Sequence, residues 1–267
     1  MRKCLAGPYI GEFGWELFNW QGYLRKRRSD YDYMTVISRP GHAALYEDFA
    51  DEFIECPARL DRLNMWKGGI DVAPIVEREK DRGGYTDFIP FDSYKWRNWQ
   101  RGSQEQAFIR YGKNTILECD ILIHVRSCFH CRSGFRNWQK EDAEAYAEWA
   151  QMKLGCSVAS IGKSETSLYI PGTTDMMNVS LGVLVDFMAS SRLIIGSQSG
   201  PHHLAALCGL PIIAWQTKPE HAERLSKHWN PFGVKTITNA TDISYWKQRK
   251  HWQPSLEWMQ EATVEML

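Results

Sequence analysis

The run Ser197–His203 combines the residue types that bind phosphate at the start of a helix. It reads Ser-Gln-Ser-Gly-Pro-His-His and stands between an apolar strand, Leu193–Ile195, and a helix rich in small residues, His202–Cys208. Ser199 suits the helix N-cap and Pro201 suits the first turn. Because the N–H groups and the positive dipole end of such a helix bind a pyrophosphate, the run predicts a diphosphate site. The alternative is an ordinary strand–turn–helix that binds no ligand.

The elements that must position this run alternate in the order of an α/β protein. The predicted strands are Lys3–Ala6, Tyr33–Ser38, Phe88–Pro90, Asp120–Val125, Ser157–Ile161, Leu193–Ile195 and Ile212–Trp215. The predicted helices are Trp15–Arg28, His42–Phe53, Lys140–Leu154, Val179–Ser190 and His202–Cys208. We expect two Rossmann-like lobes, residues 1–113 and 114–267, with the phosphate-binding run in the second.

The same run carries a resemblance to a known family. Ser199-Gly200-x-x-His203-Leu-Ala-Ala, followed by Gly209-x-Pro211, resembles the donor-site turn of heptosyltransferase-like enzymes with the glycosyltransferase-B fold. Gln198 stands where that family typically has an acidic residue. The resemblance implies a compact two-lobed enzyme whose first lobe binds the acceptor and whose second lobe binds a nucleotide-diphosphate sugar. It also suggests that the C-terminal stretch, Leu256–Leu267, packs back on the N-terminal lobe.

Other charged residues follow the neighbouring strands. His124-Val125-Arg126 is similar to the His-x-Arg of fucosyltransferases of a related fold, in which the arginine pairs with the donor diphosphate. A planar guanidinium suits that role because it binds two phosphate oxygens at once. The alternative for Arg126 is a surface ion pair. Lys163 and Glu165, in the loop Gly162–Glu165, are further donor candidates, and the alternative for both is that they are ordinary solvated loop residues. The residues expected to contact the donor are Gly11, Gly14, His124, Arg126, Arg132, Lys163, Glu165, Asp175, Ser197, Gln198, Ser199, Gly200, His202 and His203.

The glycine-rich loop Gly7–Leu17 joins the first strand to the first helix. In the family that the chain resembles, this loop faces the donor and supplies an acidic catalytic base. Sugar transfer requires a hydroxyl to lose its proton, which a carboxylate within hydrogen-bond reach accepts. The resemblance therefore indicates Glu12 as the base, with Glu16 as the alternative. Either acid also suits the first turn of a helix without any catalytic role.

Two motifs resemble metal sites only in part. Cys128-x2-Cys131 is half of a zinc site, and no second pair follows at finger-like spacing. Asp30-Tyr31-Asp32 has the Asp-x-Asp form of another glycosyltransferase class, but it precedes a strand and reads as a turn. We therefore expect no metal site and no cofactor, because phosphate-binding cations and helix N–H groups suffice to stabilise a leaving diphosphate.

Composition restricts the partners and the compartment. Lys and Arg total 32 and so do Asp and Glu, so no net field attracts nucleic acid or an anionic membrane. The sequence has no apolar run of 18 residues, which predicts no stable membrane insertion. Seven scattered cysteines and no signal peptide favour a reducing cytoplasm.

These observations predict a metal-independent glycosyltransferase that moves a sugar from a nucleotide-diphosphate donor to a hydroxyl of a glycan or other acceptor. Three alternatives remain open. One is a phage-type transferase that modifies a base in DNA, for which Trp246–His251 and Arg25–Arg28 would supply a basic aromatic patch. The others are a nucleotide- or sugar-binding protein without turnover and a nucleotide-sugar epimerase.

Overall fold

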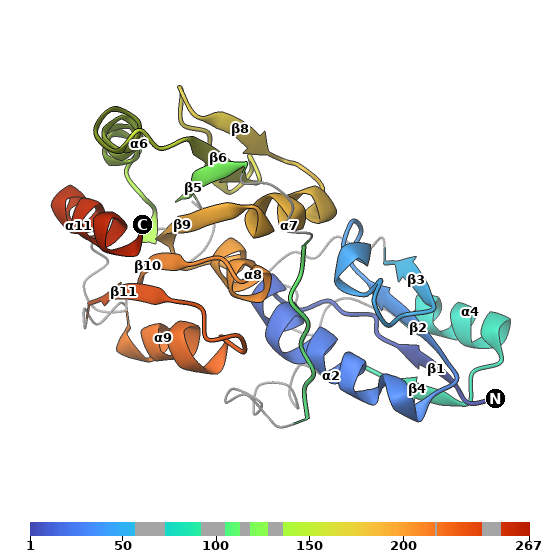
Figure 1. Ribbon diagram of the computed structural model, residues 1–267. Coiled ribbons are helices and arrows are strands. Elements are labelled where there is room, and N and C mark those ends of the chain that lie inside the picture. The colour runs from blue at the N-terminus through green and yellow to red at the C-terminus, as the bar shows by residue number, and fades with distance from the viewer. Residues whose placement is uncertain (57–72, 92–104, 113–117, 128–135, 217, 242–251) are drawn as a thin grey trace. The chain divides into compact units, whose positions relative to one another are not determined.

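The computed structural model describes residues 1–56, 73–91, 105–112, 118–127, 136–216, 218–241 and 252–267 (Figure 1). The chain forms two compact units, Met1–Phe108 and Ile109–Leu267. This division stands near the one predicted after residue 113. Each unit is built on a parallel sheet, so the predicted α/β class is confirmed.

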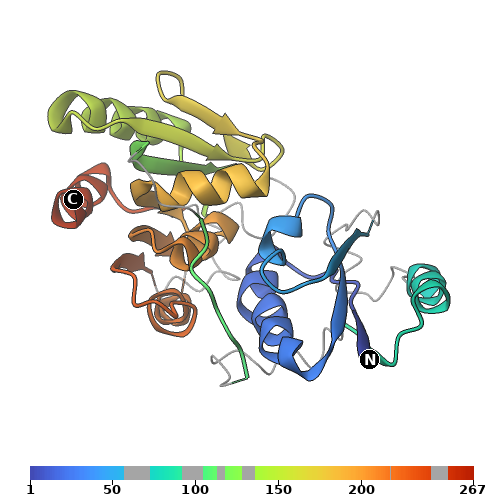
Figure 2. The same ribbon diagram turned by 45° about the vertical axis from the view of Figure 1, so that its right-hand side comes forward.

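Unit 1 contains a four-stranded parallel sheet in the order β3-β2-β1-β4. The strands are β1 (Lys3–Ala6), β2 (Tyr33–Ser38), β3 (Glu52–Glu55) and β4 (Asp87–Ile89). The predicted helix after β1 is present as α1 (Phe13–Trp15), a π-helical turn η1 (Glu16–Trp20) and α2 (Gln21–Arg27). Figure 2 shows this helical segment running alongside β1 and β2. A further helix, α4 (Ala73–Gly83), was not predicted.

The helix predicted over His42–Phe53 is wrong. Only a short 3-10 turn, η3 (Ala43–Leu45), forms there, and the segment ends in β3. The apolar side chains of this stretch are buried, but they project from a series of turns and not from one face of a helix. Asp51 ends the turns, because its carboxylate accepts the Met34 N–H at 2.7 Å and its own N–H donates to the Met34 carbonyl at 3.0 Å.

Unit 2 is a doubly wound sheet in the order β11-β10-β9-β5-β6-β8, with β7 paired antiparallel to β5. The strands are β5 (Cys119–Arg126), β6 (Val158–Gly162), β7 (Ser167–Leu168), β8 (Thr174–Met177), β9 (Ser191–Ser197), β10 (Ile212–Gln216) and β11 (Thr236–Ala240). The order reverses between β5 and β9, which is the Rossmann arrangement. The strands predicted near β5, β6, β9 and β10 are confirmed, whereas β8 and β11 were not predicted.

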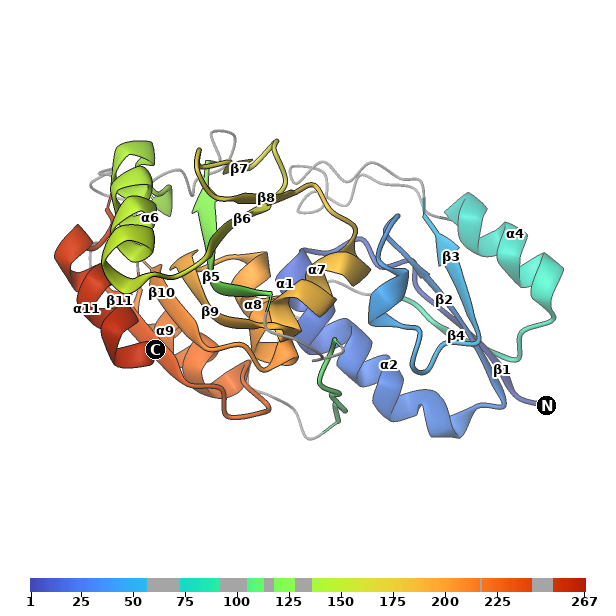
Figure 3. The same ribbon diagram turned by 45° about the horizontal axis from the view of Figure 1, so that its top comes forward.

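Helices cover both faces of this sheet (Figure 3). They are α6 (Lys140–Leu154), α7 (Leu181–Ala189), α8 (Gly200–Cys208), α9 (Pro219–Glu223) with the π-helical turn η5 (Arg224–His228), and α11 (Leu256–Met266). The helices α6 and α11 lie side by side, where the hydroxyls of Tyr146 and Thr263 are 2.7 Å apart. The predicted terminal helix therefore packs within unit 2.

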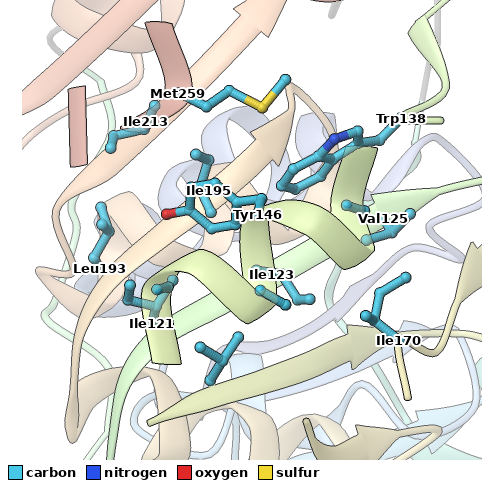
Figure 4. Close-up of a cluster of buried hydrophobic side chains, with 14 of the residues drawn as sticks. Ile121, Ile123, Val125, Trp138, Tyr146, Ile170, Leu193, Ile195, Ile213 and Met259 are labelled. Atoms are coloured by element: carbon cyan, nitrogen blue, oxygen red, sulfur yellow. The ribbon is translucent and has the colours of Figure 1, made fainter. Parts of the chain in front are cut away.

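The main core of unit 2 lies between the sheet and the pair α6–α11 (Figure 4). Alternate residues of the central strands point to this face, as the two-residue period of a strand requires. On β5 these residues are Ile121, Ile123 and Val125, all fully buried. Trp138 and Tyr146 pack over them. Because both faces of the central strands are covered, the sequences of β5 and β9 consist mainly of consecutive apolar residues.

Candidate functional site

The predicted donor residues of unit 2 gather where its strand order reverses. Arg126 ends β5 and Ser197 ends β9, and these strands are direct neighbours in parallel register. Ser199 follows as the N-cap residue of α8. In doubly wound sheets, ligands bind outside the carboxyl ends of the strands at this reversal. The tertiary fold therefore brings the His-x-Arg motif and the Ser197–His203 run together.

His124 connects these elements. Its Nδ1 lies 2.9 Å from Ser199 Oγ, and its Nε2 lies 2.9 Å from Ser167 Oγ. Ser199 Oγ is also 3.2 Å from His202 Nδ1. The Ser199 side chain consequently makes no capping bond to α8, although the residue occupies the predicted N-cap position. The hydroxyl instead links the end of β5 to the first turn of α8.

Two glycines permit this close approach. A Cβ on Gly196 would lie 2.6 Å from the His124 carbonyl oxygen and 3.2 Å from His202 Cε1. A Cβ on Gly162 would lie 2.5 Å from Ser167 Oγ. Both positions also have positive φ, 157° and 137°. Larger residues there would displace the serine and histidine side chains that surround His124.

Two buried polar groups beside α8 lack a partner among the described residues. Ser197 Oγ and His202 Nε2 are both fully buried, and neither has a hydrogen bond within that part of the chain. An unsatisfied buried donor or acceptor costs about 1–3 kcal/mol. These two atoms are therefore candidate contacts for a polar ligand at the start of α8.

The start of α8 offers a further donor. The amides of His202 and His203 both donate to the Ser199 carbonyl, at 3.1 and 3.3 Å, and Pro201 has no N–H. The Gly200 N–H has no acceptor among the residues that the structure describes. Helix starts with free N–H groups attract anions.

The histidines of this site are held neutral. Burial, together with the Arg126 charge, lowers the pKa of His124 to about 3. Burial and neighbouring positive groups, Arg136 among them, lower the pKa of His202 and His203 well below the ordinary value. Burial is the main cause for all three rings, and the nearby arginine side chains add positive charge beside them.

Gln198 is fixed behind this turn. Its N–H donates to the Trp215 carbonyl at 3.0 Å, and its carbonyl accepts Arg136 Nη1 at 3.0 Å. Its side-chain amide donates to the His221 carbonyl at 3.3 Å. Where the resembled family has an acid, this chain thus has an amide that ties β9 to α9.

The other predicted donor residues lie on exposed loops and edges. Lys163 Nζ donates to the Val179 carbonyl at 3.2 Å, and Glu165 is exposed in the following turn. Asp175 lies in the edge strand β8, where its carboxylate accepts the Met177 N–H at 2.9 Å. These three are not drawn into the cluster around His124. Arg132 lies outside the described residues.

In unit 1 the predicted glycine-rich loop follows β1 at the point where that sheet also reverses its strand order. Gly7 donates to the Ile89 carbonyl at 2.9 Å, and Tyr9 donates to the Ile37 carbonyl at 2.9 Å. A Cβ on Gly11 would lie 2.3 Å from the Tyr9 hydroxyl, so glycine is required there. Gly14 lies within the short helix α1.

The two candidate bases differ in their surroundings. Glu12 is partly exposed at the N-cap position of α1, where its carbonyl accepts the Tyr9 hydroxyl at 2.6 Å. Glu16 is fully buried in η1. Its Oε1 accepts the Ser38 and Tyr46 hydroxyls at 2.6 and 2.7 Å, and its Oε2 lies 2.8 Å from His42 Nδ1.

Burial alone would raise the pKa of Glu16, but the hydrogen bonds from His42 and Ser38, with the charge of Arg39, outweigh burial and lower the pKa. Glu16 therefore stays ionised inside unit 1. Burial and the Glu16 charge in turn raise the pKa of Tyr9 and Tyr46 well above the ordinary value.

Several residues of these clusters were missed from the sequence. Ser167, His221 and Arg224 stand far along the chain from the motifs, and His42 was placed in a helix that does not form. The turn signal Arg39-Pro40-Gly41 directly after a strand was the available clue for His42.

Within the described ranges, no group of three or more His, Cys, Asp or Glu residues is placed to hold a metal ion. The Cys128–Cys131 motif lies outside those ranges, as does the basic run Trp246–His251. Asp30 and Asp32 flank a turn, and Asp32 accepts the Arg2 N–H. None of the described helices has the length and apolar character needed to span a membrane.

No protein-family model matches this sequence, and no curated protein sequence matches it. Solved structures do match its fold. A family 9 glycosyl transferase from Veillonella parvula has a TM-score of 0.65 at 15% identity, covering 99% of this chain and 97% of that chain. Heptosyltransferase WaaC from E. coli, solved with ADP, has a TM-score of 0.61 at 11% identity over 100% of both chains. ADP-heptose LPS heptosyltransferase II from E. coli has a TM-score of 0.56 at 12% identity, covering 99% of each.

These similarities define the class of fold. The chain has the α/β architecture of glycosyltransferases of the heptosyltransferase-like kind, which confirms the fold that the Ser199–His203 motif implied.

Proposed function

We propose that this protein is a glycosyltransferase that uses a nucleotide-diphosphate sugar as donor. The observation that carries the proposal is the cluster at the strand-order reversal of unit 2. There Arg126, Ser199 and the start of α8 meet around His124. Beside them, Ser197 Oγ and His202 Nε2 are buried without partners among the described residues.

The donor diphosphate binds at this cluster in our proposal. The Gly200 N–H, the hydroxyls of Ser197 and Ser199 and the Arg126 guanidinium supply donors, and the neutral histidines orient the hydroxyls. As the bond to the anomeric carbon breaks, negative charge grows on the leaving diphosphate. Donors fixed in advance stabilise such charge at no cost of reorganisation, so the proposed transfer requires no metal.

The solved structures support an adenine nucleotide as the first donor to test. Two of them contain ADP or an ADP-heptose analogue bound to WaaC. At identities of 10–11%, these structures support the fold of this chain but do not identify its donor. ADP, UDP and GDP are therefore compared directly. Unit 1 supplies the base in this proposal, with Glu12 and Glu16 as its acidic candidates.

Thermal unfolding in the presence of each nucleoside diphosphate tests the proposal. At 100 times its Kd, a ligand of the folded state adds about 2.7 kcal/mol, or roughly 5 °C in Tm for a chain of this size. We expect one diphosphate to give this shift, its monophosphate a smaller one, and Arg126→Ala to abolish it. The matched control is Arg192→Ala, which removes an exposed ion pair with Asp120 in the same sheet. No shift with any of the three diphosphates would overturn the proposal.

A further inference from the structure

The pair Glu16–His42 joins a fully buried carboxylate to a more exposed imidazole. The side chain of Glu16 is 0% exposed, whereas that of His42 is 18% exposed. Both carboxylate oxygens of Glu16 are already occupied, by Ser38 and Tyr46 on one side and by His42 on the other. The carboxylate is therefore closed to a substrate hydroxyl, whereas part of the imidazole is exposed.

The charge of Glu16 fixes the tautomer of His42. An ionised carboxylate accepts hydrogen bonds and donates none, so His42 Nδ1 must carry the proton between them. The lone pair of the neutral ring then lies on Nε2, the nitrogen away from Glu16. A histidine held in this way by a carboxylate is prepared to accept a proton.

The fold places the pair at the carboxyl edge of the unit 1 sheet. His42 follows β2 through a turn in which its N–H donates to the Arg39 carbonyl at 3.2 Å. The π-helical turn η1, which follows the neighbouring strand β1, places Glu16 against that turn. Phe13 supports the His42 ring edge-on, with the ring centres 5.3 Å apart. π-helical turns of this kind are frequent at functional sites.

We propose that His42, oriented by Glu16, is the proton acceptor of the transfer reaction. This inference rests on the proposed glycosyl transfer and deepens it, because it replaces both acidic candidates as the direct base. Glu16 is then a positioning residue.

The step balances without a further reactant. The acceptor oxygen forms a bond to the anomeric carbon while its proton passes to His42 Nε2. The bond between the anomeric carbon and the diphosphate oxygen breaks, and its electron pair leaves with the nucleoside diphosphate. The imidazolium that forms is stabilised by the adjacent Glu16 carboxylate.

Other charged and polar groups surround His42. The Glu16 carboxylate faces it from η1, the Arg39 charge stands in the preceding turn, and the Tyr46 hydroxyl follows η3. From β3, Glu55 accepts the N–H of Gly41, the residue before His42, at 2.8 Å. Only Glu16 is in hydrogen-bond contact with the ring among the described residues, so its removal has the largest expected effect.

The test compares three variants with the wild-type protein. ADP-heptose, UDP-glucose and GDP-mannose serve as donors with water as acceptor, and release of the nucleoside diphosphate is followed across pH. His42→Asn keeps an N–H that reaches Glu16 but has no base, and we expect it to lower kcat by about 10²–10⁴-fold with donor affinity unchanged. Glu47→Gln, at an exposed glutamate of the same unit, is the matched control and should keep at least half of the wild-type kcat.

The Glu16→Gln variant distinguishes a role of Glu16 in positioning His42 from a purely structural role. Without the carboxylate the imidazolium that forms in the reaction loses its charge partner, so kcat falls while the donor affinity stays that of the wild type. Glu16→Asp should restore part of the wild-type kcat. A purely structural Glu16 would change Tm but leave kcat unaltered, and that result would overturn the proposal.

A second measurement does not depend on turnover. Nitrogen-15 spectra of histidine-labelled protein, assigned with His42→Asn, should show the His42 tautomer with its proton on Nδ1. A proton on Nε2 would overturn the inference, as would wild-type rates in His42→Asn. Failure of the glycosyltransferase proposal itself has a different signature, namely a wild-type protein that releases no diphosphate from any of the three donors.

Discussion

Ser199 Oγ lies 2.9 Å from His124 Nδ1, although the two residues are 75 positions apart in the sequence. This bond ties the end of β5 to the first turn of α8. It also takes the Ser199 hydroxyl away from the helix amides that an N-cap serine normally accepts from. The proposed diphosphate site therefore depends on a contact between its two motifs.

The first prediction concerns this hydroxyl. Ser199→Ala should weaken binding of the nucleoside diphosphate by about 10- to 100-fold, because one hydrogen bond to a charged group is worth about 1.5–3 kcal/mol. Isothermal titration measures the affinity. Ser255→Ala is the control. It removes the N-cap bond of α11, in which the Trp258 N–H donates to Ser255 Oγ, and this loss costs about 1 kcal/mol of stability. Equal affinities in the two variants would contradict a ligand role for Ser199.

The second prediction concerns the close approach of β9 to His124. Gly196→Ala places a Cβ 2.6 Å from the His124 carbonyl oxygen and should lower the free energy of unfolding by at least about 2 kcal/mol. Gly172 in the same unit also has a positive φ, 84°, but a Cβ there would have nothing within 4 Å, so Gly172→Ala is expected to cost about 1 kcal/mol. Urea unfolding measures both. Identical losses would mean that backbone conformation alone, and not the contact with His124, requires the glycine.

The third prediction concerns pH. Burial and Arg126 lower the pKa of His124 to about 3, and burial and neighbouring Arg224 and Arg136 lower that of His221 to about 4. The ordinary value in the unfolded chain is about 6.5. Between pH 6.5 and about 4 the unfolded chain thus binds more protons, and the free energy of unfolding falls as the pH falls.

Each such histidine adds at most about 1.4 kcal/mol per pH unit to this slope. The lowered pKa of Glu16 acts in the same direction, but only below its ordinary value of 4.5. Urea unfolding at pH 7.5, 6.5, 5.5 and 4.8 therefore isolates the histidines. His124→Gln should flatten the slope, and the exposed His228→Gln should not. A slope that is the same in both variants would refute the assignment to His124.

The fourth prediction concerns the terminal helix. Met259 is fully buried in the core beneath α11, so Met259→Ala should cost about 2–4 kcal/mol. Val264 on the same helix is 60% exposed, and Val264→Ala should stay within about 0.5 kcal/mol of wild type. Both substitutions keep the helix propensity high. A small effect at Met259 would show that α11 is dispensable for unit 2.

The strands near the centre of each sheet were predictable because they are covered on both faces. The apolar runs of β1, β2, β5, β9 and β10 coincide with buried segments of the structure. The edge strands were harder, since one side of an edge strand is unpaired and polar residues are tolerated there. β8 is half exposed and begins with Thr174 and Asp175, and every residue of β11 is only partly buried. Neither gives an apolar signal.

The sequence by itself determined the kind of turn at Ser197–His203, because glycine, proline and serine act on the backbone within a few residues. It also determined that a glycine-rich loop with two acids follows the first strand. Only the tertiary structure decided which polar groups those residues meet. Ser199 meets His124 rather than its own helix, and Glu16 meets His42 across a turn that local spacing read as a helix. Such partners come from neighbouring strands, and strand order is set by packing of the whole sheet rather than by any local pattern.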